Sequence, residues 1–395
     1  MQLRTLWLIV GIVGGIFVLL TCGGGLLALA FTLVGGDTPT AVETLPTAGI
    51  IGLGLGAGIS LMLHGWTAWR GQPSRPFNPS RVWLMWFAWV LLVGLGAVVT
   101  WSSAISTWWL LPIHVLAMAF PPLIALWSVG WGLRGTAGSW REVITGMTGG
   151  GVLGMGGALI GEGLLVLAFV VVIVVVALLS PGGMERMTAL ESNLDNPAWL
   201  ADSANLVQLL LSPAVAISVL GTLSIPVPLI EETVKTLASG VVARWARPNT
   251  ARAFLWGVAG GAGFALVENL FNGALGGAEA WAMGAVARFG ATMMHCITGG
   301  LVGWGWGQLW TERRAWRLLG SFVAAVVIHG VWNAITVSAV LLSASTFLHA
   351  EGSAWRIGAS LGMLTVLGLL TVTFIFALPG VGRGLAKGKP GLRQP

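Results

Sequence analysis

The chain of 395 residues contains few charged residues, only two cysteines and no tyrosine. Charged residues make up 9% of it, whereas a soluble domain typically has about 25%. This shortage excludes an ordinary soluble protein. Cys22 and Cys296 both lie in apolar segments, and two such cysteines imply neither a disulfide framework nor a cysteine metal site. The absence of tyrosine removes one common general acid from consideration.

Apolar residues are abundant instead, at 56% of the chain with a mean hydropathy of +0.87. A helix that spans a bilayer needs about 20 apolar residues. We therefore predict an all-α, polytopic transmembrane helical bundle of about ten spans. The predicted spans cover residues 7–34, 49–69, 82–101, 108–131, 152–179, 206–242, 254–271, 281–306, 318–342 and 357–378. Pro213 and Pro226 interrupt the sixth span, where we expect a kink.

Basic residues gather in alternate loops between these spans and in the C-terminal tail. They include Arg70, Arg75, Arg81, Arg134, Arg141, Arg244, Arg247, Arg252, Arg313, Arg314, Arg317 and Arg383. Because positive residues mark cytoplasmic loops, we predict a multi-pass protein of the cell (plasma) membrane with both termini cytoplasmic. Orientation in the lipid bilayer then explains the net charge of +6, and no nucleic acid partner is expected.

The spans and loops divide the chain into four consecutive regions. Residues 1–180 hold N-terminal transmembrane helices of unassigned role, and residues 181–205 form a polar external loop. Residues 206–345 hold a helical core with most of the intramembrane ionisable residues. Residues 346–395 hold the final transmembrane helix and a basic cytoplasmic tail. The chemistry is therefore expected in the C-terminal half.

Ionisable side chains recur inside consecutive apolar segments of that core. Glu231 and Glu232 are adjacent in V-P-L-I-E-E-T-V-K, and Glu268, His295 and His329 follow in the next three spans. A charge at the bilayer centre costs at least roughly 2.5–3.5 kcal/mol, so such residues are rare and usually functional. Their clustering predicts an active site within the membrane.

Helical spacing suggests which of these side chains share a face. Glu231 and Lys235 are four residues apart, the preferred order for an ion pair on a helix. Glu232 then points about 100° away. His329 and Asn333 also share a face. We therefore expect Lys235 to pair with Glu231 and to leave Glu232 facing elsewhere.

These residue types support two kinds of hydrolytic chemistry. A glutamate can accept a proton from water that attacks a carbonyl, while a histidine and an asparagine donate hydrogen bonds to the developing oxyanion. Alternatively, two histidines and one or two glutamates bind a divalent metal such as zinc and leave a position open for water. The chain has no H-E-x-x-H sequence, so metal ligands would come from separate helices.

Two other classes of function use the same residue types. A proton-coupled transporter or channel also needs buried carboxylates and histidines, but the N-terminal half shows no repeat of the C-terminal half, as many transporters do. A non-catalytic scaffold of the same fold would keep the helices without the chemistry. Both remain alternatives to a hydrolase at this point.

Four short motifs carry a resemblance to a known family. E-E-T-V-K, F-A-L-V-E-N, H-C-I-T-G and H-G-V-W-N occur in this order over residues 227–333. Together they resemble the motifs of PrsW-type intramembrane proteases. That family is distantly similar to CAAX prenyl endopeptidases and abortive-infection membrane proteins. Glu268 stands where the prenyl-processing relatives carry a second histidine.

The resemblance implies a membrane-embedded peptidase that cleaves a membrane-associated protein, such as an anti-sigma-type single-span regulator. Glu231 would be the water-activating base, with Glu232 and Lys235 as its companions. His329 and Asn333 would form the oxyanion site, and His295 would be a catalytic or metal-binding histidine. The metal alternative would use Glu268, His295 and His329.

The other polar residues of the apolar segments are not expected to have a catalytic or metal-binding role. His64 and His114 lack partners in sequence and are predicted to be structural. Asn269 follows Glu268 and is expected to support it. Arg288 lies close to the start of its span, where it is expected to extend toward the membrane surface.

Overall fold

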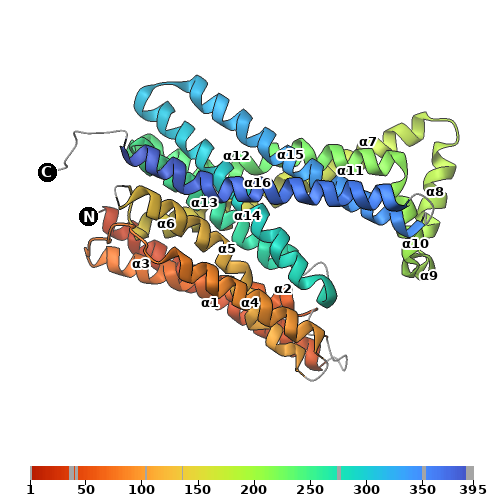
Figure 1. The fold of residues 1–395 in the computed structure, drawn as a ribbon, viewed down its shortest axis with the longest axis horizontal. Helices are drawn as coiled ribbons and strands as arrows, with labels where there is room; N and C mark the ends of the chain where they lie inside the picture. Colours follow the sequence, from red (N-terminus) through yellow and green to blue (C-terminus); the bar gives the residue numbers. More distant parts are fainter. Residues whose placement is uncertain are drawn as a thin grey trace. The chain divides into compact units, whose positions relative to one another are not determined.

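The computed structural model describes residues 2–34, 40, 43–102, 105–135, 137–273, 277–348 and 353–387. It is about 90% helical, as expected from the sequence, and no strand is assigned within these residues. The helices, labelled in Figure 1, are α1 Gln2–Val34, α2 Leu45–Leu53, α3 Ile59–Trp69, α4 Val82–Trp101, α5 Leu110–Leu133, α6 Trp140–Thr148, α7 Met155–Leu179, α8 Gly183–Leu194, α9 Pro197–Ala201, α10 Ser203–Leu211, α11 Pro213–Ser224, α12 Pro226–Ala246, α13 Thr250–Asn272, α14 Gly277–Glu312, α15 Ala315–Leu348 and α16 Ser353–Lys387. A 3₁₀ turn, η2, covers Thr107–Trp109, and two π-helical segments, η1 and η3, cover Gly54–Gly58 and Gly149–Gly154.

Nine helical segments of the described residues are long and apolar enough to cross a membrane. The predicted span 281–306 lies in α14, which is not among the nine. Glycines and the polar side chains of Arg288 and His295 lower its hydropathy. Because α14 is buried over most of its length, from Trp281 to Gln308, it contacts protein rather than lipid and need not be apolar all round.

Prolines divide the predicted sixth span, as expected. Helix α10 ends at Leu211, α11 begins at Pro213 and α12 begins at Pro226. Proline lacks the backbone N–H that an interior helix position needs, whereas the first turn tolerates it. The break before Pro226 places the two adjacent glutamates in the second turn of a new helix.

The chain forms two compact units. Unit 1 consists of Met1–Met155, Glu232–Ala325 and Thr371–Pro395, and unit 2 consists of Gly156–Glu231 and Val326–Leu370. Both are built from segments that are distant in sequence. The four consecutive regions proposed from the sequence stay a prediction.

Helix α13 is the centre of unit 1, and nearly all its residues from Ala251 to Leu270 are buried. It packs against α14 at backbone distance, because a Cβ atom at Gly257 would lie 2.1 Å from the Gly299 carbonyl oxygen. Small residues at such positions let transmembrane helices approach closely. This contact brings the second and third motifs together.

His114 has a structural role in unit 1, as predicted. Its Nδ1 accepts a hydrogen bond from Trp281 Nε1 over 3.0 Å, and its Nε2 lies 3.0 Å from the Leu270 carbonyl oxygen. Since Nδ1 accepts, Nε2 carries the proton and donates it. The fully buried imidazole therefore joins α5 to α13 and α14.

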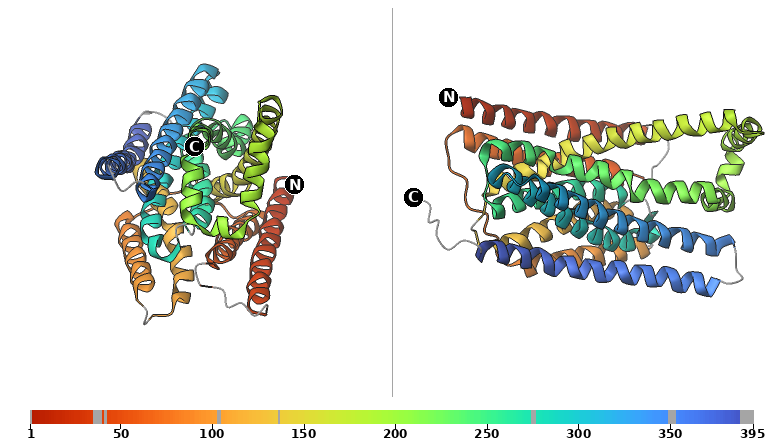
Figure 2. Two further views of the ribbon diagram at one scale, coloured as in Figure 1. Left: turned by 90° about the vertical axis from the view of Figure 1, so that its right-hand side faces the viewer. Right: turned by 90° about the horizontal axis from the view of Figure 1, so that it is seen from above.

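Unit 2 contains an apolar helix and a helical turn-around. Helix α7 exposes its valines from Val170 to Val172. It leads to α8, α9 and α10, after which α11 returns along α7 (Figure 2). The segment expected to be a polar loop, 181–205, is thus mostly helical. Asn196 and Asp202 cap α9 and α10 with their side-chain oxygens.

Candidate active site

Helix α12 supplies three of the predicted site residues. Glu231, Glu232 and Lys235 all lie in this helix and are at most 7% exposed. Ionised groups buried this deeply need partners, because desolvation otherwise makes the charged form costly. Their contacts therefore indicate how the site is built.

Lys235 pairs with Glu232 and not with Glu231, which corrects the expectation from the sequence. In unit 1 its Nζ binds Glu232 Oε1, donates to Thr298 Oγ1 over 3.0 Å and lies 3.2 Å from His295 Nδ1. Residues three apart share a helix face as well as residues four apart do. The polar groups of α14 decide between the two spacings, since they attract Lys235 toward the side of Glu232.

Glu268 forms the second part of the network in unit 1. Its Oε2 lies 2.8 Å from His295 Nε2 and accepts a hydrogen bond from Arg288 Nη2 over 2.6 Å. Arg288 Nε donates to Asn269 Oδ1 over 2.9 Å, and Asn269 Nδ2 donates to Thr292 Oγ1. Asn269 therefore supports Glu268 indirectly, through the arginine.

Arg288 does not extend toward the membrane surface as expected. Its side chain is only 15% exposed and contacts the carboxylate of Glu268. A buried arginine pairs well with a carboxylate because its planar guanidinium has five donors in a fixed geometry. Arg288 is therefore part of the polar network, which no sequence motif indicated.

Both ring nitrogens of His295 have polar neighbours within unit 1. Nε2 faces the Glu268 carboxylate and Nδ1 faces the Lys235 ammonium group. Since an ammonium group only donates and a carboxylate only accepts, the arrangement fits a neutral imidazole protonated at Nε2. The lone pair of Nδ1 then points toward a cation.

In unit 2, Glu231 and His329 face each other. His329 Nε2 lies 3.7 Å from Glu231 Oε2, and both side chains are buried. Asn333, one turn further along α15, donates from Nδ2 to the Leu223 carbonyl oxygen over 2.9 Å. This bond holds α15 to the end of α11, and the expected oxyanion role of Asn333 stays a prediction.

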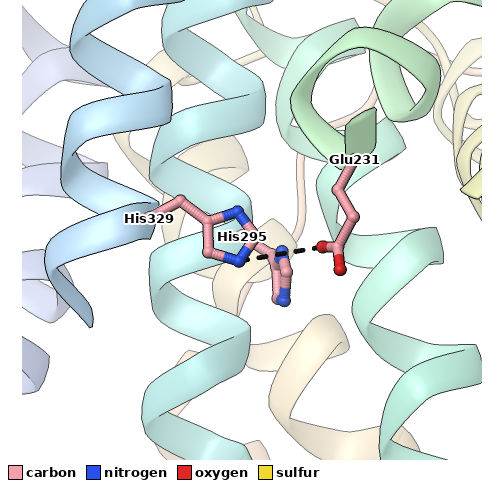
Figure 3. Close-up of side chains that lie close together, drawn as sticks. All are labelled: Glu231, His295 and His329. Carbon is pink, nitrogen blue, oxygen red and sulfur yellow. Dashed lines mark ion pairs between the residues drawn. The ribbon is translucent and has the colours of Figure 1, made fainter. Parts of the chain in front are cut away.

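Glu231, His295 and His329 each offer one potential metal-ligand atom, and the dashed line in Figure 3 marks the pair that Glu231 and His329 form within unit 2. All three side chains are buried. The metal alternative from the sequence, with Glu268, His295 and His329 as ligands, stays a prediction. In unit 1 Glu268 is the hydrogen-bond partner of His295 and Arg288.

Comparison with known protein families matches residues 162–369, just over half of the chain, to the PrsW family of intramembrane metalloproteases. The chain belongs to this family. No curated protein and no solved structure matches it. PrsW membership agrees with the four motifs and with the many apolar helices, which make this a multi-pass membrane protein.

The PrsW motif residues of α12 also border a cavity in unit 1. It has a volume of about 350 Å³ and is lined by Glu232, Thr233 and Thr236 together with apolar side chains, among them Trp306 and Phe322. A buried carboxylate at the wall of an apolar cavity is a common arrangement in enzyme sites. In unit 1, the Glu232 carboxylate therefore borders a cavity.

Proposed function

We propose that this PrsW protein hydrolyses peptide bonds in a membrane-associated protein, with Glu231, His295 and His329 binding a divalent metal such as zinc. The observation that carries the proposal is that, in a chain of this family, each unit holds a carboxylate beside a buried imidazole: Glu231 with His329 in unit 2, and Glu268 with His295 in unit 1. Zinc in hydrolytic sites typically has three protein ligands of these types and one open position.

The spacing of Glu231 and His329 supports a shared metal. Their closest atoms are 3.7 Å apart, which is too long for a hydrogen bond. Ligand bonds of 2.0–2.1 Å on a tetrahedral zinc ion imply ligand atoms roughly 3.3 Å apart. The observed spacing is thus close to that of two ligands of one ion.

The partners of His295 also fit a metal ligand. Histidines that bind a metal through one nitrogen usually donate the other N–H to a carboxylate, which fixes the ring and its tautomer. Glu268 has this position next to Nε2, so Nδ1 is the ligand atom in this proposal. When bound, a divalent ion would supply a Lewis acid for hydrolysis of the peptide bond.

Other residues of the chain have the proton-transfer, positioning and substrate-binding roles in this proposal. Glu232 accepts a proton from the attacking water at its carboxylate and passes it to the leaving amine. Lys235 holds this carboxylate in place, and the adjacent cavity receives an apolar side chain of the substrate. In this assignment Glu231 is a ligand and Glu232 the base, whereas the family resemblance implied Glu231 as the base and Glu232 as its companion.

Two isosteric variants separate these roles. Purified protein is assayed for bound metal by elemental mass spectrometry and for cleavage of a membrane peptide. We expect Glu231→Gln to lose both metal and cleavage, and Glu232→Gln to keep metal but lose cleavage. Glu191→Gln, on the exposed face of α8, serves as the control and should keep both.

The opposite result has a definite meaning. Metal retained in Glu231→Gln with cleavage lost would make Glu231 the base and remove it from the ligand set. Cleavage retained in both variants would remove both glutamates from the mechanism. A function that is lost on truncation but never on Glu or His substitution would favour the non-catalytic scaffold, and substrate flux in liposomes without proteolysis would favour the transporter.

The proposal also includes the class of substrate and the orientation of the protein in the membrane. An anti-sigma-type single-span regulator is the substrate class that the family resemblance suggests, and the basic loops suggest a plasma membrane protein with both termini cytoplasmic. Labelling of a cysteine added at the C-terminus by a membrane-impermeant reagent tests the orientation. Labelling in intact cells would contradict it.

A further inference from the structure

Unit 1 contains a second cavity, which is separate from the residues of the polar network. It has a volume of about 320 Å³ and lies among η1, α5, α6, η3 and α13. Its lining is largely apolar, with side chains such as Ile144, Met147 and Leu266, and with several glycines. None of the ionisable residues of the proposed active site lines it.

The chemistry of the lining excludes water as a stable occupant. Beside the indole groups of Trp127 and Trp140, the polar side chains of the wall are the hydroxyls of Ser60 and Thr148. Thr148 already donates to the Ile144 carbonyl oxygen over 2.9 Å. A buried water needs two to four polar partners, and apolar cavities of this size stay dry or bind apolar molecules.

The cavity is bordered by exposed residues within two membrane-spanning segments. Gly56 in η1 and Val152 in η3 both line the cavity and are both exposed. They belong to the candidate spans Leu45–Trp69 and Trp140–Leu179, well inside each span. Single π-helical turns in α-helices are often found at functional sites, and two of them flank this cavity. Its opening therefore lies within the length of two segments that are apolar enough to cross a membrane.

One wall of the cavity adjoins an aromatic and basic cluster. The rings of Trp127 and Trp140 pack edge to face, with 5.1 Å between their centroids, and Trp140 is followed by Arg141. The Arg141 guanidinium donates from Nη2 to the Gln72 carbonyl oxygen, which leaves further donors of its five N–H groups. Tryptophan and arginine at a span end are typical neighbours of lipid headgroups.

We infer that this cavity is a lipid site, in which an acyl chain of an anionic phospholipid lies between η1 and η3 and the phosphate binds Arg141. The apolar lining and the opening within two apolar segments select the acyl chain. The guanidinium selects the anionic headgroup by charge complementarity. The inference is independent of the proposed proteolysis.

A glycine of the opening offers a clean test. A Cβ atom at Gly56 would meet no atom within 4 Å, so Gly56→Leu fills the opening without a clash. Gly94 in α4 is equally exposed, has the same open surroundings and does not line the cavity, which makes Gly94→Leu a matched control. Thermal unfolding of both variants checks that they fold.

The probe is phosphatidylglycerol with a photoreactive diazirine on its acyl chain, incorporated into vesicles with the full-length protein. We expect crosslinks to Ile144, Met147 and Leu266 in the wild type and in Gly94→Leu, and their loss in Gly56→Leu. Arg141→Gln should reduce crosslinking by phosphatidylglycerol roughly fivefold, and should reduce crosslinking by phosphatidylcholine less, because the choline group offsets the charge of its phosphate.

Other outcomes would overturn the inference. Crosslinks that are unchanged in Gly56→Leu, or that fall only on the exposed valines of α7, would show that the cavity holds no lipid. Crosslinks from a photoreactive substrate peptide in place of the lipid would assign the cavity to the substrate instead.

Discussion

Arg288 donates a hydrogen bond to Glu268 over 2.6 Å, although both residues lie in helices buried inside a membrane protein. Their side chains are only 15% and 20% exposed. Each charge offsets the desolvation of the other, and removal of one partner from such a pair typically costs about 3–5 kcal/mol. Because Glu268 also contacts His295, the pair links protein stability to the orientation of a proposed metal ligand.

Replacement of Arg288 should therefore weaken metal binding without touching the metal. We expect Arg288→Met to lower zinc affinity by about 10- to 100-fold, as loss of a supporting partner does in other metal sites, and Arg288→Lys to recover part of it. Titration calorimetry with zinc measures the affinity. Arg252→Met, which breaks the more exposed pair with Glu142, is the control. Equal zinc affinities in Arg288→Met and Arg252→Met would show that Arg288 has only a structural role.

Lys235 should compete with the metal for His295. Its Nζ lies 3.2 Å from Nδ1, the proposed ligand atom, so its positive charge opposes a bound cation. We expect Lys235→Gln to bind zinc more tightly and yet to cleave more slowly, because Glu232 loses its partner. Zinc titration and turnover measured on one preparation check both effects. Weaker zinc binding together with slower cleavage would instead indicate a general loss of structure.

The close approach of α13 and α14 should not tolerate a methyl group. We expect Gly257→Ala to lower the free energy of unfolding by about 1–3 kcal/mol, because its Cβ atom would lie 2.1 Å from the Gly299 carbonyl oxygen. Gly284→Ala in α14 would meet only an ordinary contact at 3.7 Å and should be neutral or slightly stabilising. Unfolding in mixed micelles compares the two variants. A stable Gly257→Ala protein would contradict the backbone contact.

Removal of the metal should change stability as well as activity. A ligand at 100 times its dissociation constant stabilises the folded state by about 2.7 kcal/mol. We expect a chelator to abolish cleavage and lower the melting temperature, and zinc to restore both. The melting temperature of Glu231→Gln should not respond to chelator or to zinc. A chelator without effect on wild-type protein would support water activated by glutamate alone.

Most residues of the polar network could be predicted from the sequence, but the ion pairs that they form could not. Glu232, Lys235, Glu268 and His295 were all predicted as site residues, and unit 1 joins them in one buried network. The pairing of Lys235 was predicted wrongly, because the spacing along α12 allows two partners and the polar groups of α14 select one. Arg288 was missed because a position close to the start of a span also suits a residue that extends to the surface.

The sequence alone determined that this is a helical membrane protein of the PrsW family with ionisable groups in its apolar segments. Hydropathy and the cost of a charge in lipid depend on residue type and on the local segment, so they can be read without a structure. Only the tertiary structure decided which helices are buried by protein and which carboxylate binds which cation. Those choices depend on side chains that meet across helices distant in sequence, and no local pattern records such contacts.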